Sequence, residues 1–165
     1  MADFTTLCEE GNLTEVKACL RRGQDVNIQN SGGMTGLMCA VLFGHTSVVQ
    51  LLLTVENCQV NCQNRGGRTA LHWACDHKNT VIMTSLLAHP DMWSVNTPDS
   101  SGLSPVMYAV MSGNVESVRV LVSDERLDLG TMDKQGRGLE ERARWVVTMQ
   151  GTRWIWLGKL CLDSG

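Results

Sequence analysis

The sequence contains no uninterrupted apolar run of about eighteen residues, the length that a membrane-spanning helix needs, so no such helix is expected. Basic residues are not in excess either, because 14 Lys and Arg stand against 17 Asp and Glu, for a formal net charge of −3. This balance gives no strongly basic surface, so neither nucleic acid nor a membrane is expected as a partner. The opening residues MADFTTLCEEGN lack a basic segment followed by an apolar one, so no secretory signal is expected.

The motifs of the common catalytic sites are also missing. No G-x-S-x-G nucleophile elbow and no G-x-x-x-x-G-K-[ST] phosphate loop occurs, and the glycine-rich GGMTG at 32–36 lacks the Lys-Ser/Thr ending. Glu9 and Glu10 are adjacent in the chain, as are Glu140 and Glu141, and adjacent residues on a helix face different directions. We therefore expect no catalytic residue, no enzyme activity and no cofactor.

Cysteine is present seven times, an odd number, and the residues are scattered singly. Without an export signal, this pattern favours reduced thiols and a protein of the cytoplasm or nucleus. No basic pair at a helix N-terminus accompanies any of them, so none is expected to have the lowered pKa of a reactive thiol. The seven are Cys8, Cys19, Cys39, Cys58, Cys62, Cys75 and Cys161.

The chain repeats itself. The similar segments GMTGLMCAV, GRTALHWAC and GLSPVMYAV begin at Gly33, Gly67 (67 − 33 = 34) and Gly102 (102 − 67 = 35). The pair Val-Asn recurs with the same two steps, at 26–27, 60–61 and 95–96. Markers that stay in phase at one period indicate a repeat architecture. The 165 residues, 43% of them hydrophobic, suit one domain with a continuous core.

Each unit can be interpreted physically. A turn rich in Asn, Ser and Gly comes first, and a short helix follows, with Ala40, Ala74 or Ala109 on its packing face. Gly44 and Gly113 are expected to end two of these helices. The second helix carries closely spaced apolar residues, as in SVVQLLL, which form one face. Helices this short are unstable alone, so neighbouring units must share a core.

This pattern resembles the ankyrin repeat. GRTALHWAC and SPVMYAV match the family's Thr-Pro-Leu-His-x-Ala core with substitutions, and the resemblance covers residues 3–136. It implies an all-α solenoid of stacked helix-turn-helix units with projecting β-turn fingers and a concave face that binds other proteins. The predicted domain is 1–144, followed by an apolar tail or degenerate C-terminal cap at 145–165. Its predicted units are 3–29, 30–63, 64–98, 99–132 and a degenerate 133–144.

The two ends depart from the repeat. The first unit lacks the Thr-Pro-Leu-His core and carries charged outer residues, which fits a capping unit. These charged residues are Glu9, Glu10, Lys17, Arg21 and Arg22. At the other end, Gly136 continues the glycine series (136 − 102 = 34), but Glu140 replaces the usual Leu. Trp145, Trp154 and Trp156 then follow out of register. Two interpretations stay open: a degenerate last repeat, or an alternative or truncated end of a longer array.

One cluster resembles a zinc site. Cys58 and Cys62 precede His72, Cys75 and His77, and four such ligands could hold zinc if they met at one point. The repeat explains each residue separately. His72 stands at the family's histidine position, where the resemblance implies a bond to backbone across the turn, and Cys75 stands at a small core position. We therefore expect no metal.

The predicted contact residues are those of the fingers and of the exposed ends of the first helices. An apolar group with two arginines beside it suits a protein or peptide partner with apolar anchors and at least one acidic residue. The set is Met34, Leu42, Phe43, Arg65, Arg68, Trp73, Asp76, His77, Leu103, Tyr108 and Met111. For Trp73 and Tyr108, partial burial between helices is an equal alternative. The expected function is a non-catalytic adaptor or scaffold. The alternative is an ankyrin fragment of a larger protein that recruits substrate to an enzyme such as a ubiquitin ligase or kinase.

Overall fold

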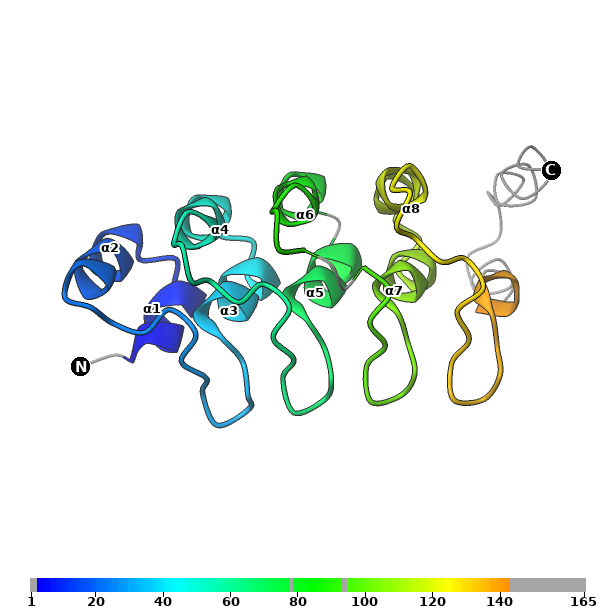
Figure 1. Cartoon of the computed structure of the whole chain (residues 1–165), viewed down its shortest axis with the longest axis horizontal. Helices are drawn as coiled ribbons and strands as arrows, with labels where there is room; N and C mark the ends of the chain where they lie inside the picture. The colour runs from blue at the N-terminus through cyan, green and yellow to red at the C-terminus, as the bar shows by residue number, and fades with distance from the viewer. Residues whose placement is uncertain (1–2, 78, 93–94, 143–165) are drawn as a thin grey trace.

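The computed structural model describes residues 3–77, 79–92 and 95–142, which form a row of paired helices (Figure 1). The helices with full bounds, in chain order, are α1 Phe4–Glu9, α2 Leu13–Arg21, α3 Gly36–Leu42, α4 Thr46–Leu53, α5 Ala70–Asp76, α6 Thr80–Leu87, α7 Pro105–Met111 and α8 Val115–Val122. Residues 139–142 are also helical and follow the last finger.

The residues that flank the helices help to explain why these short segments are helical. Of the inner helices, α1 follows Asp and the other three follow Thr or Ser, and Thr35 Oγ1 accepts the Met38 N–H at 3.3 Å. Three outer helices follow Asn, and Asn114 Oδ1 accepts the Ser117 N–H at 3.2 Å. Gly44 follows the last residues of α3 with φ of 77°, as Gly113 does for α7 with φ of 66°. The predicted glycine helix ends are therefore confirmed.

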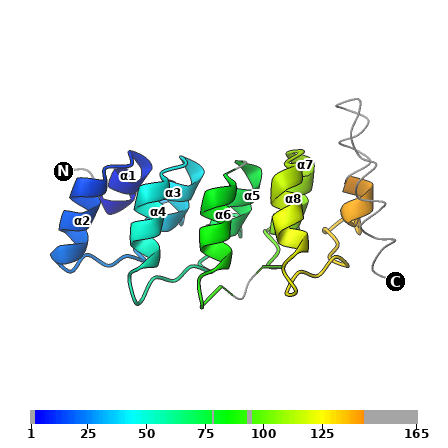
Figure 2. The same cartoon turned by 90° about the horizontal axis from the view of Figure 1, so that it is seen from above.

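The helices make two parallel layers, and the fingers project from one side (Figures 1 and 2). The inner layer consists of α1, α3, α5 and α7 and the outer layer of α2, α4, α6 and α8, with contacts between successive members of each layer. An isolated antiparallel β-bridge joins Gln29 to Thr35 at the first finger. The predicted all-α stack is confirmed.

The core runs through the stack between the two layers. Ala40, Ala74 and Ala109 are fully buried on the inner helices, as predicted from their spacing. Large apolar side chains such as Leu71 and Leu86 are also fully buried, and truncating one to Ala typically costs about 2–5 kcal/mol. Because adjacent units share this core, no unit has a hydrophobic core of its own.

The asparagines of the Val-Asn pairs tie each unit to the next. Asn27 Nδ2 donates to the Asn57 carbonyl at 2.8 Å, and Asn27 Oδ1 accepts the Gln59 N–H at 2.8 Å. Asn96 makes the same two bonds one junction later, to the Arg126 carbonyl at 2.7 Å and the Asp128 N–H at 2.8 Å. This amide needs both a donor and an acceptor, which explains why Asn recurs at the period.

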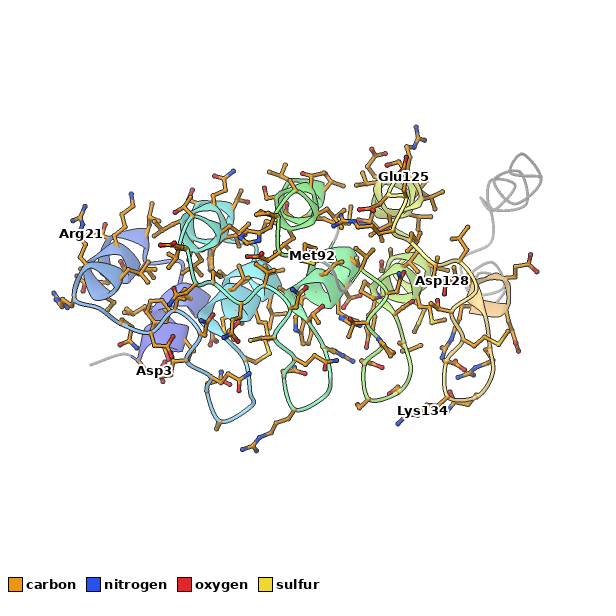
Figure 3. The ribbon with its side chains drawn as sticks, viewed as in Figure 1. Asp3, Arg21, Met92, Glu125, Asp128 and Lys134 are labelled. Carbon is orange, nitrogen blue, oxygen red and sulfur yellow. The ribbon has the colours of Figure 1, made fainter. Side chains whose placement is uncertain are left out.

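The fingers, which are the turns around Gly33, Gly67, Gly102 and Gly136, form a row. Each of these glycines has positive φ. Successive fingers are joined by main-chain hydrogen bonds, from Arg65 N–H to the Gly32 carbonyl at 3.1 Å and from Ser100 N–H to the Gly66 carbonyl at 2.9 Å. Lys134 lies at the tip of the last finger (Figure 3) and its N–H donates to the Ser101 carbonyl at 3.2 Å. The finger row is thus a connected surface.

The two ends of the stack differ. In the first unit Val16 is fully buried, and the five charged residues predicted to lie outside are all exposed. Figure 3 shows Arg21 at the outer side of this end. At the other end Leu129 is 44% exposed, although Val26, Val60 and Val95 at the same repeat position are buried. This position is therefore buried after each of the first three helix pairs and exposed after the fourth. The predictions for residues 145–165 lie outside the described residues.

Candidate partner-binding surface

Most of the predicted contact residues lie on the fingers or at the C-terminal ends of the inner helices. Phe43 and His77 are the residues that directly follow α3 and α5, and Met111 is the last residue of α7. Phe43 is 52% exposed and Met111 is 38% exposed, while Asp76 and His77 are also exposed. One edge of the inner layer therefore carries exposed apolar side chains.

Leu103 is not part of an exposed apolar group, and the expectation that it is exposed is wrong. Its side chain is buried, its N–H donates to Asp99 Oδ1 at 2.9 Å, and its carbonyl contacts His72 Nε2 at 3.1 Å. The residue lies at the base of its finger, where the previous unit packs. Met34 and Leu42 are half-buried, so they offer less apolar area than the sequence suggested.

Arg68 lies over two aromatic rings. Its guanidinium carbon lies 4.8 Å from the centre of the Trp73 ring and 4.9 Å from the centre of the Tyr108 ring. Its Nε lies 3.7 Å from Asp99 Oδ2, and its side chain stays 35% exposed. Arg65, by contrast, is exposed at the tip of the same finger. The structure therefore separates two arginines that the sequence placed together: Arg68 already has an internal counter-ion.

Asp99 is the residue of this cluster that sequence reasoning missed. Its Oδ1 accepts N–H groups from Ser101 at 2.8 Å and Leu103 at 2.9 Å, and its Oδ2 accepts the Tyr108 hydroxyl at 2.8 Å. Desolvation opposes its charge, but these hydrogen bonds prevail and lower the pKa of Asp99. A signal was present, because Asp99 stands where the two preceding fingers carry Asn30 and Asn64.

Trp73 and Tyr108 occupy equivalent places in adjacent units but differ in burial. Tyr108 is buried, and desolvation together with the bond to Asp99 raises its pKa to about 12, so the hydroxyl stays a donor. Trp73 is half-buried, and its Nε1 is buried without an acceptor among the described residues. Partial or full burial thus applies to both residues, while the Trp73 ring face lies against Arg68.

His72 is fully engaged inside the stack. The Thr69 N–H donates to its Nδ1 at 3.0 Å, so Nε2 carries the proton and donates to the Leu103 carbonyl of the next unit at 3.1 Å. The ring is 1% exposed, and burial lowers the pKa of His72 to about 4. With both nitrogens used, His72 has no lone pair left for a metal.

The other residues of the zinc candidate have separate contacts. Cys75 is buried against Met83, with 3.9 Å between the sulfurs, and Cys62 Sγ lies 3.3 Å from Gln59 Oε1. Within the described ranges, no three His, Cys, Asp or Glu residues form a group that could hold a metal ion. Burial raises the pKa of Cys8 to about 12 and that of Cys58 to about 11. These thiols have the environment of core residues rather than of nucleophiles.

Alkylation should distinguish the cysteines by depth. We expect iodoacetamide at pH 8 to modify Cys19 and Cys62, which are half-buried, well before Cys8 and Cys75, which are fully buried. Time-resolved peptide mass spectrometry of the native protein measures each rate, and a sample in denaturant gives the unprotected rates. Equal native rates at Cys62 and Cys75 would show that the contact between α5 and α6 opens readily.

The last finger has a carboxylate at the position equivalent to Asp99, but its hydrogen-bond partners differ. Asp133 accepts from Arg137 Nε at 2.9 Å and also from Arg142 Nη2. Arg142 stands at the repeat position of Tyr108, since 142 − 108 = 34. The carboxylate beneath the finger is thus kept, while its aromatic donor is replaced by a cation.

Comparisons with known proteins agree with this geometry. The family model of ankyrin repeats in three copies matches residues 5–94 and 53–133. The probable E3 ubiquitin-protein ligase XBOS32 of Oryza sativa subsp. japonica is 28% identical over 149 residues, covering 73% of this chain and 29% of that protein. Rabankyrin-5 of Homo sapiens is 31% identical over 141 residues, covering 78% of this chain and 12% of that protein. B-cell lymphoma 3 protein of Homo sapiens is 30% identical over 135 residues, covering 78% and 29%.

The chain spans less than a third of the length of each of these three relatives. In the part of the chain that the structure describes, no helix is long and apolar enough to cross a membrane.

Proposed function

Because the chain belongs to the ankyrin-repeat family, whose repeats indicate protein–protein interaction, we propose that it is a non-catalytic adaptor or scaffold module. It binds its partner through the finger row and the concave face along the inner helices. The observation that carries this proposal is the pair of large apolar side chains left open at the ends of inner helices, Phe43 and Met111.

The partner is a protein or peptide segment with apolar anchors and an acidic residue. Phe43 and Met111 supply apolar contact area, and aromatic and Met side chains are enriched in interface cores. Arg65 and Arg68 supply positive charge on the neighbouring finger. The net charge of −3 disfavours nucleic acid as the partner.

A second candidate function follows from the relatives. The chain matches 29% of the length of a probable E3 ubiquitin-protein ligase, so it has the size of a recruiting part within a larger enzyme. In that case the same surface would hold the substrate of a ubiquitin ligase or kinase domain carried elsewhere. The binding surface is common to both functions, so the first experiment tests both.

Phe43→Asp should strongly reduce partner capture, and Val81→Asp should not. Both substitutions place a charge at an exposed apolar residue, since Phe43 is 52% and Val81 55% exposed, but Val81 lies on outer helix α6. We expect Phe43→Asp to reduce the retained partner at least about tenfold, because a central aromatic contact is worth about 2 kcal/mol or more. Quantitative mass spectrometry of proteins captured from cell extract measures this, after circular dichroism shows equal melting. Loss with Val81→Asp alone would move the binding surface to the outer layer.

A further inference from the structure

We propose that Arg68 is the residue that recognises the acidic side chain of the partner, through the edge of its guanidinium that Asp99 leaves open. This inference rests on the interaction role proposed above and assigns one residue to one feature of the partner. It also makes Arg68, and not the equally charged Arg65, the determinant of specificity.

The first argument is the fixed orientation of the guanidinium. The rings of Trp73 and Tyr108 lie 4.8 and 4.9 Å from its carbon, so the group lies over both rings. Free arginine side chains lose much rotamer entropy when they form an ion pair, and this loss offsets most of the gain at exposed sites. Contact with the rings removes this rotamer entropy when the protein folds. A partner carboxylate therefore binds a guanidinium that is already ordered.

The second argument is that the cluster has unpaired donors, whereas its acceptor oxygens already accept hydrogen bonds. Both oxygens of Asp99 are occupied, by the N–H groups of Ser101 and Leu103 and by the Tyr108 hydroxyl, with Arg68 Nε beside Oδ2. The Nη1 and Nη2 groups of Arg68 have no hydrogen-bond partner among the described residues, and neither has the buried Trp73 Nε1. A ligand must therefore bring acceptors, and a carboxylate matches the forked geometry of Nη1 and Nη2.

The same occupancy argues against a cationic side chain as the ligand. Arg68 already lies over both rings, and both oxygens of the carboxylate that could attract a second cation already accept hydrogen bonds. Asp76, exposed at the end of α5, is a further negative charge that acts on Tyr108. Its repulsion favours a single acidic residue in the partner over an acidic run.

Arg65 provides the matched comparison within one finger. It carries the same charge at the fingertip, but it is exposed and no ring lies against it among the contacts of the described residues. A carboxylate paired there would be screened by salt and would have to order the side chain.

The experiment selects the ligand and then tests its acidic residue. A phage library of random twelve-residue peptides is selected on the 165-residue chain. The best peptide and its Asp→Asn or Glu→Gln counterpart are synthesised and titrated by calorimetry against wild type, Arg68→Lys and Arg65→Lys. We expect Arg68→Lys to weaken the acidic peptide about tenfold and to leave the amide peptide unchanged, because Lys keeps the charge and loses the fork. Arg65→Lys should change both affinities less than about threefold.

Each other outcome has a defined meaning. Selected peptides without an acidic residue, or an acidic residue coupled to Arg65, overturn this inference and leave the interaction role intact. Equal weakening of both peptides by Arg68→Lys shows a structural role and also overturns it. Failure to select any peptide removes the interaction role and the inference with it, while binding that is indifferent to both Phe43→Asp and Arg68→Lys overturns the proposed surface and the inference but leaves an interaction role.

Discussion

Lowering the pH from 7 to 4 is expected to destabilise the stack by about 3 kcal/mol through His72 alone. Its pKa is about 4 in the folded chain, where burial disfavours the charged ring, against 6.5 for an unperturbed histidine. Above pH 6.5 the ring is neutral in both states, and its contribution to stability is complete. Between pH 6.5 and 4 the unfolded chain binds a proton that the folded chain does not, so stability falls by about 1.4 kcal/mol for each pH unit.

The loss matters because the His72 ring connects two units. Protonation would add a proton to Nδ1, which in the neutral ring accepts the Thr69 N–H at 3.0 Å at the start of α5. Nε2 would keep its bond to Leu103 of the following unit. The helix cap, rather than the inter-unit bond, is therefore the part that acid disrupts first.

Urea unfolding at intervals from pH 7 to 4.5 measures this slope. His72→Gln should be less stable than wild type at pH 7 by about 1–2 kcal/mol, because it loses a buried hydrogen bond, and its stability should depend little on pH over this range. His77→Gln, at an exposed position five residues later, should keep the wild-type slope. A wild-type slope that persists in His72→Gln would assign the acid sensitivity to another group.

Gly67→Ala should cost about 3 kcal/mol, through strain and a clash acting together. Gly67 has φ of 75°, which side-chain-bearing residues rarely adopt. An added Cβ would lie 2.7 Å from the backbone nitrogen of Ser100 and 3.0 Å from the backbone carbon of Asp99. Backbone atoms cannot rotate away, so the second and third fingers would have to separate and stretch the bond from Ser100 N–H to the Gly66 carbonyl.

Gly136→Ala is the matched control for this substitution. Gly136 has nearly the same φ, 73°, but an added Cβ there meets no atom of the described residues within 4 Å. It should therefore cost only the conformational strain, about 1 kcal/mol. The difference between the two variants in denaturant unfolding isolates the contribution of finger packing. Equal losses would show that the fingers can move apart without cost.

The fold could be predicted from the sequence because the same residue types recur at the same positions in each unit. Gly33, Gly67 and Gly102 each need positive φ, and each recurs at the period. The burial of Ala74 also follows from position within the unit, and both features depend on the unit itself, which is why the repeat pattern identified them. The bond of His72 crosses to the next unit, and the resemblance to the ankyrin repeat, rather than the pattern, implied it.

The contacts between units were predicted less well. The pairing of Arg68 with Asp99 joins two fingers, and it depends on how one unit is offset against the next. Leu103 was misassigned for the same reason, since it is buried by the preceding unit through His72. A search for opposite charges one period apart, near a turn position that changes from Asn to Asp, would have suggested the pair.

The asparagine side chains that join each unit to the following loop have a consequence for how such a chain can change over generations. Asn27 and Asn96 each reach only the next junction, and they make the same two bonds there. Duplication of one unit would therefore recreate every existing junction and add one more of the same kind. Gain or loss of whole units during evolution can therefore lengthen or shorten the binding surface, while the remaining units keep their structure.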